Sequence, residues 1–580
     1  MKKKGAKNYL RMRVTIVGAG FALVLAVIAG RAVQLQVYRH RWLSEMAAGQ
    51  YEKSYVSQGK RGAIYDARFH DLAVSLDVTS IGIHPRKIAD RRRAAVKLAK
   101  ALRMSRRQVR HKLKSGKNFV WLKRKASPRQ VAAVKALSLK GVAFVRERSR
   151  FYPNRSLAAQ VIGFCGVDGK GLEGLEFFYN RTLQGAEDRF TVWRDARGRW
   201  FEADRPPYIA DAGNNLVLTI DAAVQHITEK ALAEAVRKYS AKAGMAIVMR
   251  PDTGAIMALA NYPYFNPNSY RDYSKSRWRN RAITDPFEPG STMKIFLAAA
   301  ALESGKISPG SIFFCENGAY RIGRRTVHDT HPYGWLSLQQ IVKKSSNIGA
   351  VKVGALVGAK GLHEQLRALG FGSRTGIDAP GESAGLLMSY RKWTRIDAGA
   401  IAFGQGLAVT AVQLATAVSA IANGGILMRP YLVQAITDAN GKLVRKIAPR
   451  KVRRAVSAET ARTLRRIMRT VTTEGGTGVN AALEGYAVAG KTGTAQKVGP
   501  EGGYARGKYV SSFVGFVPAE NPEAVILVVV DEPRRFHYGG TVAAPAFKTI
   551  ARSVMDYLGV PPQRPEGGKF NVALVEEVRP

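Results

Sequence analysis

The feature that most constrains the fold of this chain is a set of three short motifs, spread in a fixed order over its C-terminal half. In the first, Ser291 precedes Lys294 by three positions, after a Pro-Gly turn and at the head of an apolar run. Positions i and i+3 lie on one face of a helix, so the hydroxyl and the amine can meet. Free N–H groups at a helix N-terminus also favour developing negative charge. The segment therefore predicts a serine nucleophile beside a lysine.

A Ser-x-x-Lys pair alone is weak evidence, because Ser57–Lys60 and Ser389–Lys392 repeat the spacing without this context. Two further motifs strengthen it, namely Ser345-Ser346-Asn347 and Lys491-Thr492-Gly493-Thr494. Ser-x-x-Lys, Ser-x-Asn and Lys-Thr-Gly, in this order, are the three elements of penicillin-binding proteins and serine β-lactamases. The alternative, a solvated helix face and an unrelated surface turn, is much weaker for three ordered motifs than for one.

Each motif residue has a chemical task in this interpretation. Ser291 is the candidate nucleophile, and a hydroxyl needs a base within hydrogen-bonding distance. Lys294 is the candidate base, which must be neutral; desolvation and a second cation, Lys491, would both lower its pKa. Ser345 is expected between the two lysines, where it can pass a proton to the leaving amine. Asn347 is expected to orient Lys294 or to hold a substrate carbonyl.

The Lys-Thr-Gly segment is expected to form a strand along the candidate cleft. Residues 485–494 alternate small and β-prone side chains, and their glycines allow close backbone approach. An extended substrate could pair with this strand, with Lys491 and Thr492 holding its terminal carboxylate. The backbone N–H groups of Ser291 and Thr494 are the expected oxyanion donors. The candidate substrate-binding and oxyanion residues are Thr492, Gly493 and Thr494.

Outside the three motifs the chain resembles a class B penicillin-binding protein. The resemblance rests on five blocks: Arg61–Asp66 with Leu72-Ala73, Gly163–Asp168 with Gly171–Glu176, Arg194–Gly198, Leu218–Asp221 with Gln225, and Gly404-Gln-Gly406 with Val409-Thr410 and Gln413. Ala67-Arg68 and His70 replace the usual Arg and Gly of the first block, a departure confined to that turn. Tyr509–Pro518 and Tyr538-Gly-Gly540 are similar to the division-specific, FtsI-like branch of the family.

The resemblance implies a multidomain α/β protein with an elongated α+β pedestal. Its transpeptidase domain would hold an antiparallel sheet flanked by helices and an all-helical lobe. Strand-like runs at 243–259 and 524–530, and helical apolar patterns at 295–302 and 339–356, agree with this fold. The expected segments are a cytoplasmic tail (1–13), a transmembrane signal anchor (14–37), the pedestal (38–210), the transpeptidase domain (211–559) and a C-terminal tail (560–580).

An apolar segment near the start of the chain predicts a membrane helix. Val14 to Gly30 carries no charge and is near the lower length limit for a spanning helix; the apolar stretch continues beyond Arg31 to Val37. Lys and Arg residues dominate the preceding tail, so the N-terminus is expected in the cytoplasm and the catalytic domain in the periplasm. A cleaved signal peptide is the alternative. Because no small-x-small cleavage site follows the run, we expect a retained single-pass anchor in the inner membrane.

The net charge of +48 is concentrated rather than even. Residues 86–155 hold 24 Lys or Arg against 2 acidic residues, with helical and strand-like apolar spacing that predicts a folded head. No nucleic acid is expected as a partner, because the segment holds no recognised binding motif and is expected outside the cytoplasm. Anionic lipid headgroups, lipid-linked precursor and acidic cell-wall polymer are the physical candidates. A general preference for basic surfaces is the alternative.

The resemblance implies peptidoglycan D,D-transpeptidation during septal cell-wall synthesis. Stem peptides would acylate Ser291 and β-lactams would inhibit it covalently. Implied partners are an FtsW-like division glycan polymerase and other divisome proteins. No cofactor and no metal are expected, because Cys165 and Cys315 stand apart and no ligand cluster has metal-binding spacing. The alternatives are an elongation-type class B enzyme, a β-lactam sensor or β-lactamase-like protein, and a non-enzymatic scaffold.

Overall fold

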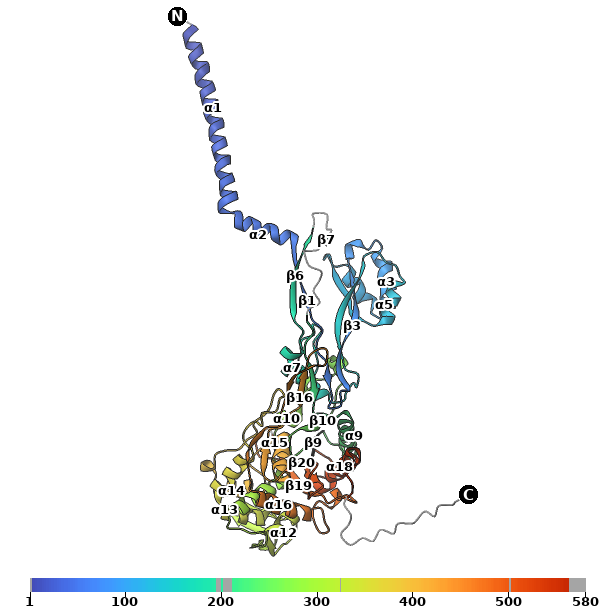
Figure 1. Ribbon diagram of the computed structural model, residues 1–580, viewed down its shortest axis with the longest axis vertical. Helices are drawn as coiled ribbons and strands as arrows, with labels where there is room; N and C mark the ends of the chain where they lie inside the picture. Colours follow the sequence, from blue (N-terminus) through green and yellow to red (C-terminus); the bar gives the residue numbers. More distant parts are fainter. Residues whose placement is uncertain (1–2, 195–199, 202–210, 324, 500–501, 563–580) are drawn as a thin grey trace, which may run out of the picture. The chain divides into compact units, whose positions relative to one another are not determined.

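The computed structural model describes residues 3–194, 200–201, 211–323, 325–499 and 502–562 (Figure 1). They fall into two units, which we describe separately. One unit holds residues 1–60 and 185–212, and the other holds residues 61–184 and 213–580. Most of the Arg194–Gly198 block and of the predicted C-terminal tail lies outside the described residues.

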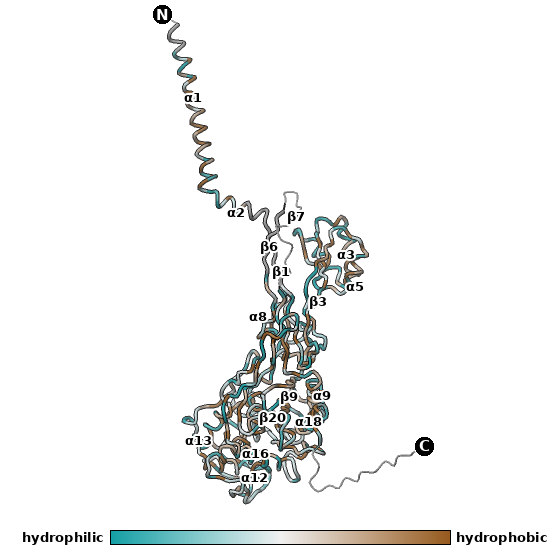
Figure 2. The backbone as a smooth tube through the Cα atoms, viewed as in Figure 1, coloured by the Kyte–Doolittle hydropathy of each residue, from teal (hydrophilic) through white to brown (hydrophobic). Residues whose placement is uncertain are grey.

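The first unit carries the apolar N-terminal segment. Asn8–Tyr38 is the one stretch of the described residues that is long and apolar enough to cross a membrane (Figure 2). It contains the predicted anchor at 14–37 and has the length of a spanning helix. A three-stranded antiparallel sheet, ordered β1-β6-β7, completes this unit. Its elements are α1 (Lys3–Val33), the π-helical segment Gln34–Tyr38, α2 (His40–Tyr51), β1 (Glu52–Gln58), β6 (Glu187–Arg194) and β7 (Trp200–Phe201).

In the second unit, a seven-stranded sheet connects the expected pedestal with the catalytic half. Its order is β17-β16-β8-β2-β3-β4, with β5 also paired to β3. Strand β2 runs parallel to β8, and the other pairs are antiparallel. The strands are β2 (Ile64–Tyr65), β3 (Asp71–Ile83), β4 (Val120–Ala126), β5 (Val142–Phe151), β8 (Asn215–Leu218), β16 (Val433–Thr437) and β17 (Leu443–Lys446).

The basic segment 86–155 folds into a small head on β3, β4 and β5. Of its three helices, α4 (Arg106–Leu113) and α5 (Pro128–Lys135) contact β4 and β3, and α3 (Arg91–Leu102) packs against both of these helices. Each helix starts at a side-chain cap, from Asp90, Ser105 and Ser127 respectively, which satisfies free N–H groups of the first turn. The buried core of the head is aliphatic and includes Leu98, Leu102, Val109, Leu113 and Leu122.

A buried charge cluster explains two of the family blocks in the pedestal. The Glu176 carboxylate is fully buried and pairs with Arg61 Nε at 2.7 Å and Arg150 Nε at 2.6 Å. Tyr152 and Cys165 also donate to this carboxylate, at 3.3 and 3.2 Å. Burial raises the pKa of the Cys165 thiol to about 12, so the thiol stays protonated and unreactive.

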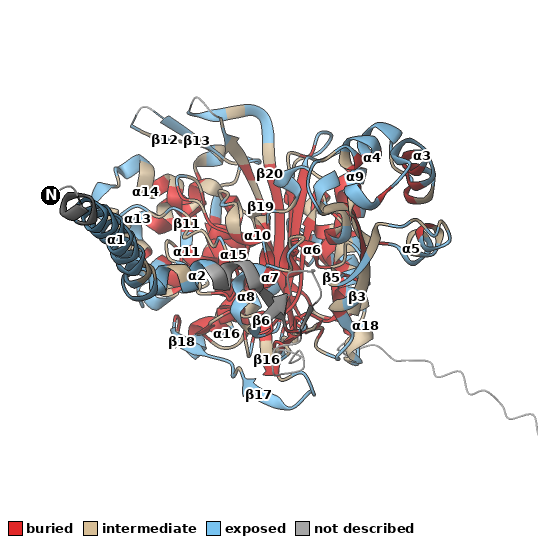
Figure 3. Ribbon diagram, turned by 90° about the horizontal axis from the view of Figure 1, so that it is seen from above, coloured by how far each residue is buried: buried red, intermediate tan, exposed pale blue. Residues whose placement is uncertain are grey.

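The catalytic half is built on a five-stranded antiparallel sheet ordered β10-β9-β21-β20-β19. Helices cover both of its faces, and the central strands are buried on both sides (Figure 3). Along β21, Val525, Leu527 and Val529 face one core, and the residues between them face the other, since strand side chains alternate. The strands are β9 (Ala243–Met249), β10 (Ile256–Tyr262), β19 (Ala489–Val498), β20 (Tyr504–Val517) and β21 (Ala524–Asp531).

Helices α9 (Ala222–Lys238) and α18 (Ala544–Leu558) pack on one face of this sheet. Helices α11 (Met293–Glu303), α15 (Ala411–Ala422) and α16 (Ala458–Thr470) lie on the other side, and α12 (Leu338–Lys344), α13 (Asn347–Ala368) and α14 (Arg395–Ala402) continue that helical lobe. The predicted antiparallel sheet with flanking helices is confirmed. The helical pattern expected at 339–356 was wrong in one respect, because Ser345 is left-handed (φ 65°) and divides it into α12 and α13.

Glu229 on α9 predicts a pH-dependent stability. Burial raises its pKa to about 7, against hydrogen bonds from Gln225 and the Ala158 N–H that favour the charged form. The folded pKa lies above the unfolded value, so the stabilising contribution is complete below about pH 4.5 and is lost as the pH rises through 7. Glu229→Gln keeps both acceptor contacts and should raise the free energy of unfolding at pH 8 by about 1–3 kcal/mol. Thermal unfolding at pH 5 and pH 8 measures the difference.

The exposed Glu234 on the same helix supplies the control. Glu234→Gln should leave stability unchanged at both pH values. An equal effect of Glu229→Gln at pH 5 and pH 8 would contradict the assignment, because only an ionised carboxylate is costly there.

Candidate active site

Ser291 lies in a tight turn that leads directly into a buried helix. A 3₁₀ turn, Gly290–Thr292, precedes α11, as the motif predicted for a serine at a helix start. Gly290 has φ 54°, and a Cβ there would lie 2.5 Å from the Thr494 carbonyl oxygen, so only glycine fits. This contact brings the serine turn against the Lys-Thr-Gly strand, β19.

Lys294 Nζ contacts three other residues of the motifs. It lies 3.0 Å from Ser291 Oγ and 3.2 Å from Ser345 Oγ. It also donates to the Ser345 carbonyl oxygen at 2.6 Å and to Asn347 Oδ1 at 2.8 Å. The side chain is 1% exposed. Helix α11 and the turn before it supply the lysine and the serine, and the break between α12 and α13 supplies the other two residues.

Ser345 lies between two lysines. Lys491 Nζ is 3.0 Å from Ser345 Oγ, and it also contacts Thr492 O and Oγ1 at 3.2 Å. The left-handed conformation of Ser345 ends α12, and Ser346 then caps α13 by accepting from the Gly349 N–H. The break between the two helices thus presents the Ser345 hydroxyl to both amines.

Burial lowers the pKa of both lysines. The pKa of Lys294 falls to about 7 because the ammonium is desolvated, although the Asp329 carboxylate opposes this effect. The pKa of Lys491 falls well below its ordinary value, through burial and then through the positive charge of Lys294. The sequence predicted that burial and Lys491 together would lower the Lys294 pKa. Burial is the main cause for both lysines in the structure, and their mutual repulsion disfavours charging both at once.

Asp329 is a site residue that sequence reasoning missed. Its carboxylate accepts hydrogen bonds from Ser346 Oγ at 2.5 Å and from the backbone N–H groups of Asn347 and Ile348. A carboxylate at a helix N-terminus satisfies free donors and complements the helix dipole. Asp329 thus holds the start of α13, and with it Asn347, against Lys294. No local pattern marks this residue, because Asp329 lies 18 residues before the start of the helix that it contacts.

The Lys-Thr-Gly segment forms the edge strand β19, with one side paired to β20. It begins at Ala489, four residues after the predicted start. Gly493 allows the strand to approach the serine turn, since a Cβ there would lie 2.9 Å from the Pro289 carbonyl oxygen. Thr494 Oγ1 accepts from Gly539 N–H at 3.1 Å, which ties β19 to the short helix α17 (Gly539–Val542).

A cleft of about 1050 Å³ opens onto these residues. Ser291, Ser345, Asn347, Thr492 and Thr494 line it. Lys294, Lys491 and Gly493 are not in the lining; both lysines are buried behind the two serines. The free edge of β19 borders the cleft, so an extended peptide can pair with its backbone.

Sequence reasoning also missed Glu288 and Tyr504 as site residues, because neither is one of the motif residues to which a chemical role could be assigned. Glu288 Oε1 accepts from the Gly406 N–H at 2.9 Å and from Tyr504 OH at 3.3 Å. Burial raises the Glu288 pKa, against these two hydrogen bonds. The contacts connect the serine turn with the Gly-Gln-Gly block and with the first residue of β20.

The arrangement can perform acyl transfer. The Ser291 hydroxyl lines the cleft, and the buried Lys294 amine beside it has a lowered pKa. Ser345 and Lys491 form a second hydroxyl–amine pair next to them. Two family models match the chain. One, described as the penicillin binding protein transpeptidase domain, covers residues 244–552. The other, described as the penicillin-binding protein dimerisation domain, covers residues 56–218.

Similar proteins span nearly the whole chain. The probable peptidoglycan D,D-transpeptidase PenA of Neisseria meningitidis is 35% identical over 559 residues, covering 95% of this chain and 94% of that one. The peptidoglycan D,D-transpeptidase FtsI of Escherichia coli K12 is 32% identical over 580 residues (98% and 96%). The crystal structure of penicillin-binding protein 3 from Mycobacterium tuberculosis with aztreonam has a TM-score of 0.69 at 30% identity (88% and 99%). The chain belongs to the class B penicillin-binding proteins, a family of peptidoglycan D,D-transpeptidases.

Proposed function

We propose that this protein cross-links peptidoglycan stem peptides at the division septum, through an acyl-enzyme on Ser291. The observation that carries the proposal is the contact set of Lys294 Nζ, which joins the nucleophile to the Ser-x-Asn motif. The N-terminus would lie in the cytoplasm, with the chain anchored through 14–37 and the catalytic domain outside. We assign the pedestal to 38–210 and the transpeptidase domain to 211–559; the two family models match residues 56–218 and 244–552.

The acylation step follows from the donors and acceptors around Lys294. A neutral amine has two N–H groups and one lone pair. The Ser345 carbonyl oxygen and Asn347 Oδ1 accept the two N–H groups, at 2.6 and 2.8 Å. The lone pair is then left for the Ser291 hydroxyl, 3.0 Å away. Lys294 takes that proton as Ser291 Oγ attacks the carbonyl of the penultimate D-alanine.

The same groups can return the proton to the leaving amine. Ser345 Oγ is within 3.2 Å of Lys294 Nζ and 3.0 Å of Lys491 Nζ, so a proton can pass from Lys294 through the hydroxyl. The terminal D-alanine departs as a free amine, and the acyl-enzyme remains. A side-chain amine of a neighbouring stem then attacks the ester, and Ser291 recovers its proton. The backbone N–H groups of Ser291 and Thr494 would stabilise the oxyanion in both halves.

Separate observations support the proposed role in division and the proposed inhibition by β-lactams. The match to FtsI over nearly its full length, and the Tyr509–Pro518 and Tyr538–Gly540 blocks, favour the septal branch. Penicillin-binding protein 3 of Mycobacterium tuberculosis forms a complex with aztreonam, a β-lactam, which supports acylation of this chain by such compounds. An FtsW-like glycan polymerase and other divisome proteins are the partners we propose.

Labelling of the full chain with a fluorescent penicillin tests the proposed chemistry. A stable adduct is expected on the peptide that contains Ser291, identified by mass spectrometry after digestion. An adduct on another residue would refute Ser291 as the nucleophile, and rapid loss of the label by hydrolysis would point to a β-lactamase-like activity. Depletion in the source bacterium separates the two branches of the family: filaments with unfinished septa are expected, whereas rounded cells would indicate an elongation enzyme.

The Lys294 pKa predicts the pH dependence of acylation. The neutral amine is the active form, so the acylation rate constant should rise with pH through about 7. Between pH 6 and pH 8 the neutral fraction increases about tenfold, and the rate should follow it. Stopped-flow measurement of penicillin acylation over this range provides the profile. A flat profile would exclude Lys294 as the group that accepts the proton.

A further inference from the structure

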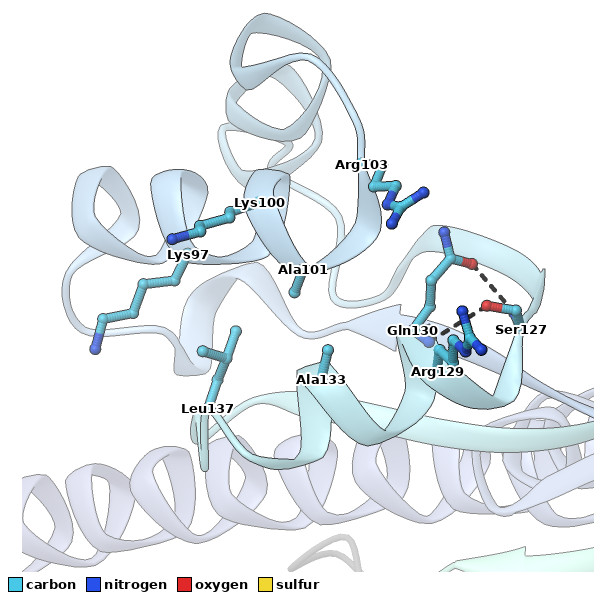
Figure 4. A pocket seen from close by; sticks show the side chains of 9 residues that line it. All are labelled: Lys97, Lys100, Ala101, Arg103, Ser127, Arg129, Gln130, Ala133 and Leu137. Carbon is cyan, nitrogen blue, oxygen red and sulfur yellow. Dashed lines mark hydrogen bonds between the residues drawn. The ribbon is translucent and has the colours of Figure 1, made fainter.

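A cationic groove lies in the head, far in sequence from the catalytic motifs. Its volume is about 560 Å³, and it runs between α3 and α5. Lys97, Lys100, Arg103 and Arg129 extend along its rim, and Ala101, Ala133 and Leu137 form an apolar floor between them (Figure 4). The described residues that line it include no carboxylate.

The protein does not neutralise these four cations internally. Within the wholly described segment 86–155, only Asp90 and Glu147 are acidic. Asp90 accepts from the Arg93 N–H as the cap of α3, and Glu147 pairs with Arg124 at 2.7 Å. None of the four groove cations makes an ion pair with a described residue. All four side chains are exposed, so their charges are available to an external anion.

The shape and chemistry of the groove select the kind of anion. Lys and Arg recognise phosphate through charge-assisted hydrogen bonds, and the planar guanidinium groups of Arg103 and Arg129 suit two phosphate oxygens. The apolar floor suits a ligand that also has an uncharged, apolar part. A long acidic polymer would need an extended stripe, whereas this site is a single short groove.

We propose that the groove between α3 and α5 binds the phosphate headgroup of an anionic phospholipid. The four cations hold the phosphodiester, and Ala101, Ala133 and Leu137 contact the glycerol and the first acyl carbons. The same chain carries a helix able to cross a membrane, so such lipids are available to the protein. This inference does not depend on the proposed transpeptidase function.

Native mass spectrometry of the full chain in a neutral detergent, titrated with phosphatidylglycerol, tests the proposal. We expect K97Q/K100Q/R103Q to weaken binding at least tenfold. The matched variant R106Q/R107Q/R110Q removes three exposed cations of α4 in the same head and should bind within twofold of wild type. Ala133→Glu, which removes no cation but adds a carboxylate to the floor, should weaken binding as much as the triple groove variant.

Equal losses in the groove and α4 variants would overturn the proposal, because diffuse charge would then be sufficient. Phosphatidylcholine binding as strongly as phosphatidylglycerol would also overturn it. Inorganic phosphate competing as well as the lipid would identify a free-phosphate site, and polyglutamate doing so would identify an acidic polymer; either result excludes the lipid. Unchanged penicillin labelling and thermal unfolding in each variant show that the fold is intact.

Discussion

Replacement of Lys294 by methionine is expected to slow penicillin acylation of Ser291 by about a thousandfold or more. Methionine is similar in length and fills the buried space, but it has no lone pair basic enough to accept the serine proton. General-base catalysis contributes about 10²–10⁴ to a rate, and the loss here also removes the proton return through Ser345. Single-turnover labelling with a fluorescent penicillin measures the acylation rate constant.

A second variant separates proton transfer from positioning. Lys294→Arg keeps N–H donors that can contact the Ser345 carbonyl oxygen and Asn347 Oδ1, but arginine stays protonated in proteins. If Lys294 acts only by holding Asn347 and Ser345 in place, arginine should restore much of the rate. If Lys294 is the base, arginine should be as slow as methionine, and neither variant should show the rise in rate near pH 7.

The chain supplies its own control for spacing. Lys392 is exposed and lies three positions after Ser389, so Lys392→Met removes a lysine from an identical Ser-x-x-Lys pair outside the site. Its acylation rate should equal that of wild type. Wild-type rates in Lys294→Met would refute the proposed base and direct attention to Lys491.

The proximity of the five candidate catalytic residues could be predicted because each motif names its own residues and the three motifs occur in a known order. Their roles in catalysis stay predictions. The contribution of Asp329 could not be predicted, since it caps a helix that begins 18 residues later and the helical pattern at 339–356 hid that start. Apolar periodicity reports a buried face, but it does not report a single left-handed residue such as Ser345.

Parts of the fold could also be predicted from the sequence, and other parts could not. The sheet core was evident in apolar runs such as 524–530, because a strand buried on both faces has no polar positions. The seven-stranded sheet was not evident, because short strands carry little pattern and its neighbours are far apart in sequence: β16 pairs with β8 from more than 200 residues away, and β8 in turn pairs with β2. The buried cluster around Glu176 was visible only as two family blocks. Charged residues in a sequence are usually read as surface, and nothing local indicates that these are buried.

That cluster carries the second large prediction. Burial alone would raise the pKa of Glu176, but the charges of Arg150 and Arg61 outweigh it and hold that pKa below its ordinary value. Glu176→Gln preserves the side-chain shape and leaves two nearly buried guanidinium groups without a counter-charge. Breaking a buried ion pair from one side costs about 3–5 kcal/mol, so the pedestal should unfold at a markedly lower temperature.

The sign of the pH effect provides a check that a simple packing defect would not show. The folded pKa lies below the unfolded value, so the stability from Glu176 is present above about pH 4.5 and is lost as the pH falls through the folded pKa. The loss of unfolding free energy caused by Glu176→Gln should therefore be largest near pH 7 and should shrink in acid. Glu173→Gln is a control of opposite sign: burial raises the pKa of Glu173, so this variant should lose no stability at neutral pH. Arg61 and Arg150 donate to different oxygens of Glu176, so the single carbonyl oxygen of glutamine can accept from only one of them. The pH dependence separates the two effects. A loss of stability that shrinks in acid comes from the missing charge, whereas an equal loss at every pH would mean that the carboxylate serves only as a hydrogen-bond acceptor.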